Sequence, residues 1–274
     1  MSTTSTAPDA GTAADVVVRL RDIGKTFPGV IANQDVNIDV HKGTVHAIVG
    51  ENGAGKSTLM KILYGVQKPD SGTIEIDGEQ VSFSSPSDAI AHGVGMVFQH
   101  FMLADNLTVL ENVEHFMLAD NLTVLENVVL GAEKLHGIGD AARARIRELS
   151  DTYGLGIEPD ALVANLGVGA RQRIEILKVL YRGARIVILD EPTAVLVPQE
   201  VDELFDNLRE LKSEGLAVIF ISHKLDEVLS VADTVTVIRR GTTVQTLPGR
   251  SVTSRQLAEL MVGSELPSPS TEAS

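Results

Sequence analysis

The sequence predicts an α/β protein whose sheet is mostly parallel and covered by helices on both faces. Short β-branched runs alternate along the chain with segments of helical spacing, and several of the runs are apolar at every position, which is typical of strands buried on both faces. With 274 residues, the chain can bury a full core as one large domain or as one domain with a subdomain.

These patterns assign strands and helices in order along the chain. The clearest helix follows Pro198, which suits a first helical turn, and it ends before Gly215, which suits a C-terminal cap. Another helix is expected at about 56–64. The middle of the chain, about 101–183, has no convincing strand and several helical stretches, so we expect a helical insertion there. The expected strands are 16–23, 36–40, 44–50, 73–77, 94–99, 185–190, 217–222 and 234–240.

The composition excludes several classes of protein. The net charge is −14 and the Lys and Arg residues are scattered, whereas a nucleic-acid partner needs a basic face. The chain has no Cys, no apolar run near the roughly 20 residues that span a bilayer, and no signal-peptide core at its start. Residues 1–14 and 264–274 have little to bury and are expected to be disordered tails. A soluble, cytoplasmic protein is therefore expected.

The strongest motif is GENGAGKST at 50–58, which fits G-x-x-x-x-G-K-[ST] between an expected strand and an expected helix. Glycines let consecutive backbone N–H groups turn inward around phosphate oxygens, and the helix N-terminus adds partial positive charge. Lys56 is expected to reach the β- and γ-phosphates, and the Ser57 hydroxyl to ligate Mg²⁺. A glycine-rich turn that binds nothing is the weaker alternative, because the full pattern is rare by chance. The predicted nucleotide-binding residues of this loop are Gly50, Glu51, Asn52, Gly53, Ala54, Gly55, Lys56, Ser57 and Thr58.

Polar residues also follow three of the apolar strands. RIVILDEP at 185–192 contains Asp190, which fits hydrated Mg²⁺, and Glu191, which fits a base that orients or polarises the attacking water. Gln99 closes VGMVFQ and is a candidate metal ligand and water sensor. His223 follows AVIFIS and is a candidate donor to the γ-phosphate. Each alone would more often be structural, but ligands of open α/β sheets bind at the carboxyl ends of strands, which favours one shared site.

Four motifs in this order, GENGAGKST, MVFQ, RIVILDEPTA and FISHKLDEV, resemble the nucleotide-binding domain of ATP-binding cassette proteins over about 15–263. The resemblance implies a RecA-like core with an antiparallel β subdomain and a helical subdomain, and two such domains that close head-to-tail on two ATP molecules. It also implies that Phe27 stacks on adenine, that Gln99 lies in the loop that couples ATP to a transmembrane partner, and that Glu191 and His223 serve hydrolysis.

The signature of this family, normally LSGGQ, corresponds to LGVGA at 166–170. By resemblance, the signature acts on the other domain's ATP through backbone N–H groups, a Ser hydroxyl and a helix N-terminus, so Gly167 and Gly169 are further nucleotide-binding candidates. Gly167 replaces the Ser and removes a hydrogen bond that is worth about 1.5–3 kcal/mol when it joins a charged group. Val197 stands where many cassettes carry Asp. Both departures are expected to affect hydrolysis more than nucleotide binding.

The segments HFMLADNLTVLENVVLGAEK, EPTAVL and ISHKLDEV are similar to segments of the ATPase subunits of importers of simple sugars and nucleosides. Such subunits commonly carry two cassettes in one chain, so this chain resembles the N-terminal half of one. The resemblance implies an ATPase that uses ATP and Mg²⁺ and lies peripherally on the cytoplasmic face of the cell membrane. It implies transmembrane permease subunits and a second cassette as partners, with an extracellular solute-binding protein as an indirect one.

A stretch of fifteen residues occurs twice in succession, at 100–114 and 115–129, and the copies differ only where Glu114 corresponds to Val129. A repeat architecture needs at least three copies, so we interpret the doubling as a recent in-frame duplication or an error of sequence assembly. Folding and ATP binding are expected to survive it, while coupling to the membrane partner weakens. Each copy contains a capping-box signal, at Thr108 and Glu111 and at Thr123 and Glu126.

Three other functions are alternatives to an importer ATPase. A soluble cassette protein that acts on ribosomes or DNA conflicts with the acidic charge and the lack of a basic arm. A non-hydrolysing regulatory cassette is supported by Gly167, Val197 and the doubled stretch, and opposed by the intact Lys56, Glu191 and His223. A generic phosphate-loop kinase would not need the motifs that follow the phosphate loop.

Overall fold

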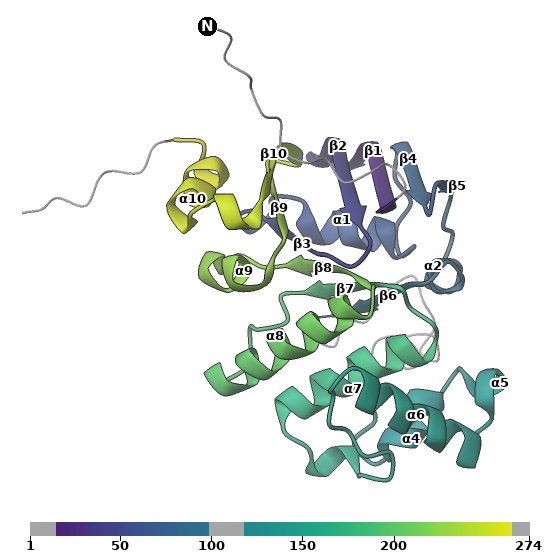
Figure 1. The fold of residues 1–274 in the computed structure, drawn as a ribbon. Helices are drawn as coiled ribbons and strands as arrows, with labels where there is room; N and C mark the ends of the chain where they lie inside the picture. The colour runs from purple at the N-terminus through teal and green to yellow at the C-terminus, as the bar shows by residue number, and fades with distance from the viewer. Residues whose placement is uncertain (1–14, 99–117, 265–274) are drawn as a thin grey trace, which may run out of the picture.

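A computed structural model describes residues 15–98 and 118–264 of the chain (Figure 1). Gln99, the first copy of the doubled stretch and the two predicted tails, apart from Ser264, lie outside these residues. The described chain forms an antiparallel sheet at one end, a larger sheet in the middle, and a group of helices at the other end.

The larger sheet contains six strands among the described residues, in the order β10-β9-β3-β8-β7-β6. Neighbouring strands from β9 to β6 are parallel, and only β10 pairs antiparallel, with β9. The predicted mostly parallel sheet is therefore confirmed. Its strands are β3 (Val45–Val49), β6 (Val94–Val97), β7 (Ile186–Asp190), β8 (Ala217–Ile221), β9 (Thr234–Arg239) and β10 (Thr242–Pro248).

Helices follow most of these strands, and a larger group lies between β6 and β7 (Figure 1). The predicted helix after Pro198 is α8, and Gly215 takes a φ of 85° just beyond its end, as a C-terminal cap requires. No helix of the described ranges is long and apolar enough to cross a membrane. The helices next to the sheet are α1 (Lys56–Leu63), α2 (Pro86–Ala91), α8 (Pro198–Ser213), α9 (Leu225–Val231) and α10 (Ser254–Val262). Those between β6 and β7 are α4 (Val124–Val129), α5 (Glu133–His136), α6 (Asp140–Thr152), the 3₁₀ turn η2 (Val163–Asn165) and α7 (Val168–Tyr181).

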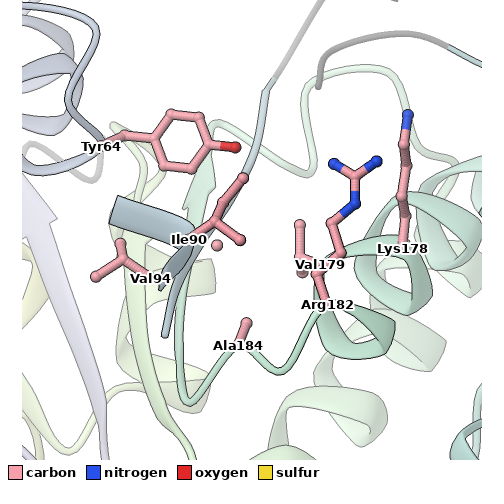
Figure 2. A pocket seen from close by; sticks show the side chains of 8 residues that line it. Tyr64, Ile90, Val94, Lys178, Val179, Arg182 and Ala184 are labelled. Carbon is pink, nitrogen blue, oxygen red and sulfur yellow. The ribbon is translucent and has the colours of Figure 1, made fainter. Parts of the chain in front are cut away.

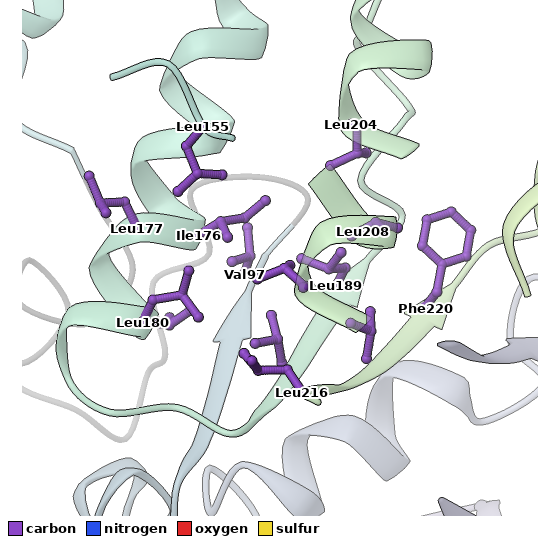
Figure 3. Packing of buried hydrophobic residues seen from close by; sticks show 14 of the residues in the cluster. Val97, Leu155, Ile176, Leu177, Leu180, Leu189, Leu204, Leu208, Leu216 and Phe220 are labelled. Atoms are coloured by element: carbon purple, nitrogen blue, oxygen red, sulfur yellow. The ribbon is translucent and has the colours of Figure 1, made fainter. Parts of the chain in front are cut away.

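The central strands bury both of their faces. In β8, Val218 and Phe220 belong to a hydrophobic cluster shared with α7 and α8, whereas Ala217, Ile219 and Ile221 belong to a second cluster shared with α1 and the antiparallel sheet. Figure 3 shows the first cluster, where the strands meet the two helices. Because successive side chains of a strand point to opposite faces, a strand between two cores must be apolar throughout. This explains the continuous apolar runs in the sequence.

The smaller sheet is antiparallel, with the order β2-β1-β4-β5 among the described residues. The predicted strand 36–40 is too short, because Asn33, Gln34 and Asp35 interrupt the apolar alternation. Asp35 also takes a φ of 49° where the pairing of β2 with β1 is irregular. The sequence patterns miss β5 and β10, which are edge strands without a fully buried residue and therefore show no continuous apolar face. The strands are β1 (Val16–Phe27), β2 (Val30–His41), β4 (Ser71–Ile76) and β5 (Glu79–Val81).

The second copy of the doubled stretch, from Leu118 onward, is part of the helical group. Its predicted capping box is confirmed, since the Thr123 N–H donates to Glu126 Oε2 at 2.7 Å and the Glu126 N–H donates to Thr123 Oγ1 at 3.3 Å. The buried Asn127 donates to Ala119 O and accepts from Ala119 N–H. These contacts integrate the second copy into the fold. The parallel sheet, the antiparallel sheet and the helical group together confirm the predicted fold class.

Candidate functional site

The phosphate loop connects β3 to α1, and two of its glycines are required by close backbone contacts. A Cβ atom on Gly50 would lie 2.3 Å from Ile238 O, and one on Gly55 would lie 2.2 Å from Ala32 O. Gly55 also takes a φ of 100°, which side chains rarely allow, at the residue that caps α1. Neighbouring strands therefore hold the loop close, and glycine is needed at both positions.

Lys56 folds back over this loop. Its Nζ donates to Gly50 O at 2.7 Å and to Glu51 O at 3.0 Å, and the residue is only 6% exposed. Burial lowers the pKa of Lys56, whereas the carboxylates of Glu191 and Asp190 raise it. The ammonium group is thus held near two acidic side chains, at the start of a helix whose first turn contains no acidic residue.

Asp190, the last residue of β7, carries an unsatisfied buried oxygen. The residue is 7% exposed, and its Oδ1 has no hydrogen-bond partner among the described atoms. Burial is the main cause that raises the pKa of Asp190, and Glu191 adds to it, while Lys56 and a hydrogen bond from Ser57 lower it. Such an oxygen needs a cation or a donor. A carboxylate and a hydroxyl are hard oxygen ligands of the kind that Mg²⁺ takes together with phosphate oxygens, so these residues fit the ion.

Glu191 and His223 lie together at the ends of neighbouring strands. The Nδ1 atom of His223 is 2.9 Å from Glu191 Oε1, and the Glu191 N–H donates to Ile221 O at 2.9 Å, which extends the pairing of β7 with β8. The Glu191 side chain is 12% exposed and that of His223 is 49% exposed. Glu191 also has a φ of 48°, an uncommon backbone conformation for a residue other than glycine.

A polar network that the sequence motifs did not predict joins the loops carrying Glu191 and His223. Lys224 Nζ donates to Thr193 O and to Glu227 Oε1, both at 3.1 Å, and the Thr193 hydroxyl donates to the same Glu227 carboxylate. Only the spacing of Lys224 and Glu227, three residues apart at the start of a helix, could have suggested it.

A second link that no sequence motif predicted comes from α7. Gln172 Nε2 donates to the carbonyl of Pro192 at 2.7 Å. This bond ties the helix after the signature to the loop that carries Glu191. The two partners are 20 residues apart, and no local pattern relates them.

Phe27 lies at the end of β1, in the hairpin that rests on the phosphate loop. The side-chain amide of Asn33, on β2, donates to Gly55 O at 3.2 Å. Phe27 is half-buried and pairs with Val30 across the hairpin turn. The structure therefore brings the hairpin of Phe27 to the loop, while the stacking of Phe27 on adenine stays a prediction.

The signature segment has a partner within the chain itself. Gly167 caps α7 and is exposed, but the Gly169 N–H donates to Glu200 Oε1 at 3.0 Å. The other oxygen of Glu200 accepts from Val197 N–H at 3.1 Å, and Val197 itself has no side-chain acceptor to offer in return. One carboxylate therefore occupies the N-terminal ends of both α7 and α8. The predicted contact of Gly169 with a phosphate stays a prediction, and in this structure its amide serves Glu200.

A small cavity lies between β6 and α7 (Figure 2), outside the candidate site. Its volume of about 10 Å³ is near the minimum that holds one water molecule, far below a nucleotide. None of the predicted site residues lines it. The lining residues are Tyr64, Ile90, Val94, Gly95, Lys178, Val179, Arg182 and Ala184.

A sequence model of the family described as ABC transporter matches residues 33–194, more than half of the chain. The chain belongs to the ABC transporter family. The matched range includes the phosphate loop, the signature segment and the Asp190–Glu191 pair, and its last residue is Ala194.

Curated relatives of this ABC cassette are import proteins. It is 47% identical over 254 residues to the nucleoside import ATP-binding protein NupA of Lactococcus lactis subsp. cremoris, covering 92% of this chain and 47% of that protein. It is 47% identical over 255 residues to the guanosine import ATP-binding protein NupO of Bacillus subtilis, with the same coverage. It is 46% identical over 263 residues to the ribose import ATP-binding protein RbsA 3 of Rubrobacter xylanophilus, covering 93% and 50%. The chain spans about half the length of these relatives.

Solved structures of ABC cassettes share the fold. The structure of cbiO1 from Clostridium perfringens, part of the ABC transporter complex cbiONQ, matches with a TM-score of 0.73 and 28% identity over 90% of this chain and 93% of that one. The ADP conformation of MJ1267, an ATP-binding cassette of an ABC transporter, matches with a TM-score of 0.74 and 24% identity over 90% and 95%. The second likeness concerns the fold alone.

Proposed function

We propose that this cassette binds ATP with Mg²⁺ and hydrolyses it to energise a membrane importer of nucleosides or simple sugars. One observation carries the catalytic part of the proposal. The phosphate loop follows β3, and the neighbouring strands β8 and β7 run on into His223 and into Asp190 and Glu191. Carboxyl ends of parallel strands meet at one edge of a sheet, where α/β proteins bind ligands. The relatives named for nucleoside, guanosine and ribose import support the solute class.

In the proposed site, each residue has one role. The loop N–H groups and the N-terminus of α1 bind phosphate oxygens, and Lys56 leaves the loop carbonyls to bind the β- and γ-phosphates. Ser57 and Asp190 would hold Mg²⁺, and the bound ion would neutralise charge on the phosphates. Glu191 orients the attacking water and takes up its proton. His223, hydrogen-bonded to Glu191, donates to the γ-phosphate.

The proposed partners are transmembrane permease subunits and a second cassette, with an extracellular solute-binding protein acting indirectly, at the cytoplasmic face of the cell membrane. The names of the relatives as import ATP-binding proteins support this, and so does their length, about twice that of the matched chain. The choice of solute is expected to reside in the permease and the binding protein. Gln99 and the first copy of the doubled stretch, both assigned to the coupling surface by resemblance, lie outside the described residues.

A hydrolysis-impaired regulatory cassette is the second candidate. Gly167 offers no hydroxyl to a phosphate, and the Gly169 N–H is already bonded to Glu200. Both features weaken the surface that would act on the ATP of a second cassette, and neither touches the phosphate loop.

ATP binding and phosphate release by the purified chain test the proposal and separate the two candidates. Lys56→Ala is expected to lower ATP affinity, because it removes the cation of the loop. Glu191→Gln is expected to retain ATP binding and to lower kcat by a factor of about 10²–10⁴, the usual contribution of a general base. Glu79→Gln, at an exposed position of β5, is the matched control.

Each outcome has a separate meaning. Loss of phosphate release in Glu191→Gln, with ATP binding retained and with release retained in the wild type and in Glu79→Gln, supports the ATPase part of the proposal. Tight ATP binding by the wild type without measurable release would favour the regulatory cassette. Failure of the wild type to bind ATP would overturn both.

A further inference from the structure

The end of β1 is held in place by one acidic residue from a distant loop. Asp70 Oδ1 accepts from Lys25 Nζ at 2.8 Å, and Asp70 Oδ2 accepts from Thr26 N–H at 2.7 Å. In return, the Asp70 N–H donates to Gly24 O at 2.8 Å. Three consecutive residues before Phe27 are thus bonded to Asp70, although 44 residues separate Thr26 from it.

The same lysine lies over the aromatic ring. Lys25 and Phe27 are two residues apart on one strand, so their side chains emerge on the same side. Lys25 Nζ is 5.7 Å from the centre of the Phe27 ring, within the range of a cation–π contact. The Lys25 side chain is only 17% exposed, so its ammonium group is held by Asp70 rather than extended into solvent. One face of the ring is thereby covered.

Apolar side chains lie beside the ring without cover from the described chain. Val30 is 59% exposed and Ile31 is 58% exposed, and both belong to the strand that pairs with Phe27 and Thr26. This hairpin is anchored on the phosphate loop by the bond from Asn33 to Gly55 O. An exposed apolar platform therefore lies next to the loop that binds phosphates, which is where the base of a nucleotide would extend.

We propose that Lys25 and Asp70 are positioning residues that present the open face of Phe27 to the base of a bound nucleotide. The inference rests on the proposed ATP binding. Asp70 fixes the backbone before Phe27 and holds the Lys25 ammonium group, and Lys25 covers one face of the ring and leaves the other for stacking. The contacts that argue for this role join both residues to the end of β1, so their contribution is expected only with ligands that carry a base.

The test compares ATP with inorganic tripolyphosphate, which has the phosphates and lacks the base, by calorimetric titration with the purified full chain. Lys25→Met and Asp70→Asn are expected to weaken ATP binding about two- to fivefold, the size of a cation–π contact, and to leave tripolyphosphate binding unchanged. Lys25→Arg is expected to restore ATP binding, because Arg keeps the cation. Lys68→Met, at an exposed position of the same loop, is the matched control and should bind both ligands like the wild type.

The outcomes separate this inference from the function on which it rests. Equal weakening of both ligands would show a general structural effect and overturn the inference, and so would no weakening at all. Phe27→Ala is expected to weaken ATP binding more than Lys25→Met does. If it leaves ATP binding unchanged, Phe27 is not the stacking residue and the inference fails while ATP binding stands. If the wild type binds neither ligand, the proposed function itself fails.

Discussion

His46 shows how one buried residue makes the central sheet sensitive to pH. It lies in β3, the strand that leads into the phosphate loop, and its Nε2 is 2.7 Å from the hydroxyl of Thr236 on β9. Burial is the main cause that lowers the pKa of His46 to about 4, with a further decrease from His41 and a partial increase from Asp39. The ring is therefore neutral in the fold at any pH at which the cell operates.

The free energy of unfolding is expected to fall as the pH falls from about 6.5 to 4. In this window the unfolded chain protonates His46, whereas the folded chain does not, so protons favour unfolding. The decrease in the free energy of unfolding due to this residue is about 2–3 kcal/mol at pH 4.5.

Urea unfolding at pH 7.5 and pH 4.5 should show a smaller decrease in the free energy of unfolding for His46→Gln than for the wild type. An equal loss in both would mean that other groups cause the acid sensitivity. Asp190, whose raised pKa acts in the opposite direction, does not contribute to the loss.

At the scale of elements, the two copies of the doubled stretch differ at one position, and in the second copy this position lies in the core. Val129 is 4% exposed and belongs to the larger hydrophobic cluster, together with Val124, Leu125 and Val128 of the same short helix. The corresponding residue of the first copy is Glu114. A charged side chain in the place of Val129 would lose its solvation, which costs free energy unless another group pairs with the charge. The two copies are thus equivalent in pattern and unequal in their fit to the core.

Two deletions test this difference with a single-residue contrast. Removal of 100–114 or of 115–129 gives chains that are identical except for Val or Glu just before Leu130. The first deletion is expected to retain the stability and the ATP affinity of the full chain and to bind the membrane partner more tightly. The second is expected to be about 2–4 kcal/mol less stable, because it buries the carboxylate. Urea unfolding of both chains measures this, and equal stabilities would show that the position of Val129 tolerates a charge.

At the scale of the whole molecule, Glu200 joins the helical group to the helices of the core. Its carboxylate accepts from Gly169 N–H on α7 and from Val197 N–H at the start of α8. A negative charge at two helix N-termini is favourable, and here it occupies the Gly169 N–H, the group that is predicted by resemblance to bind a phosphate. Glu203, one turn further along α8, pairs with Arg173 of α7 and also links the two helices without reaching Gly169.

Glu200→Ala is expected to strengthen ATP-dependent association of two cassettes, because it removes the carboxylate that competes with a phosphate for the Gly169 N–H. Sedimentation velocity with ATP in a Glu191→Gln background, in which ATP is expected to persist, should show a larger dimer fraction. Glu203→Ala is the matched control, since it also removes a link between α7 and α8 but leaves the Gly169 amide bonded. If both variants respond alike, the effect comes from loosening of the helices and not from the amide.

The sequence by itself determined the elements whose patterns are local. The loop at 50–58, the apolar strand that ends in Asp190 and the amphipathic helix after Pro198 follow from neighbouring residues, because phosphate loops, buried strands and helix caps need particular residue types at short spacing. The fold class follows from their alternation.

Only the tertiary structure decided the contacts between distant segments. The sequence patterns did not predict the full length of β2 or the edge strands β5 and β10. They also did not predict the hydrogen bonds of Asp70 to β1 or of Gly169 to Glu200, because the neighbours of these residues in the sequence do not indicate the partner. Such contacts depend on how whole elements pack and in which register their strands pair, and packing is a property of the complete chain.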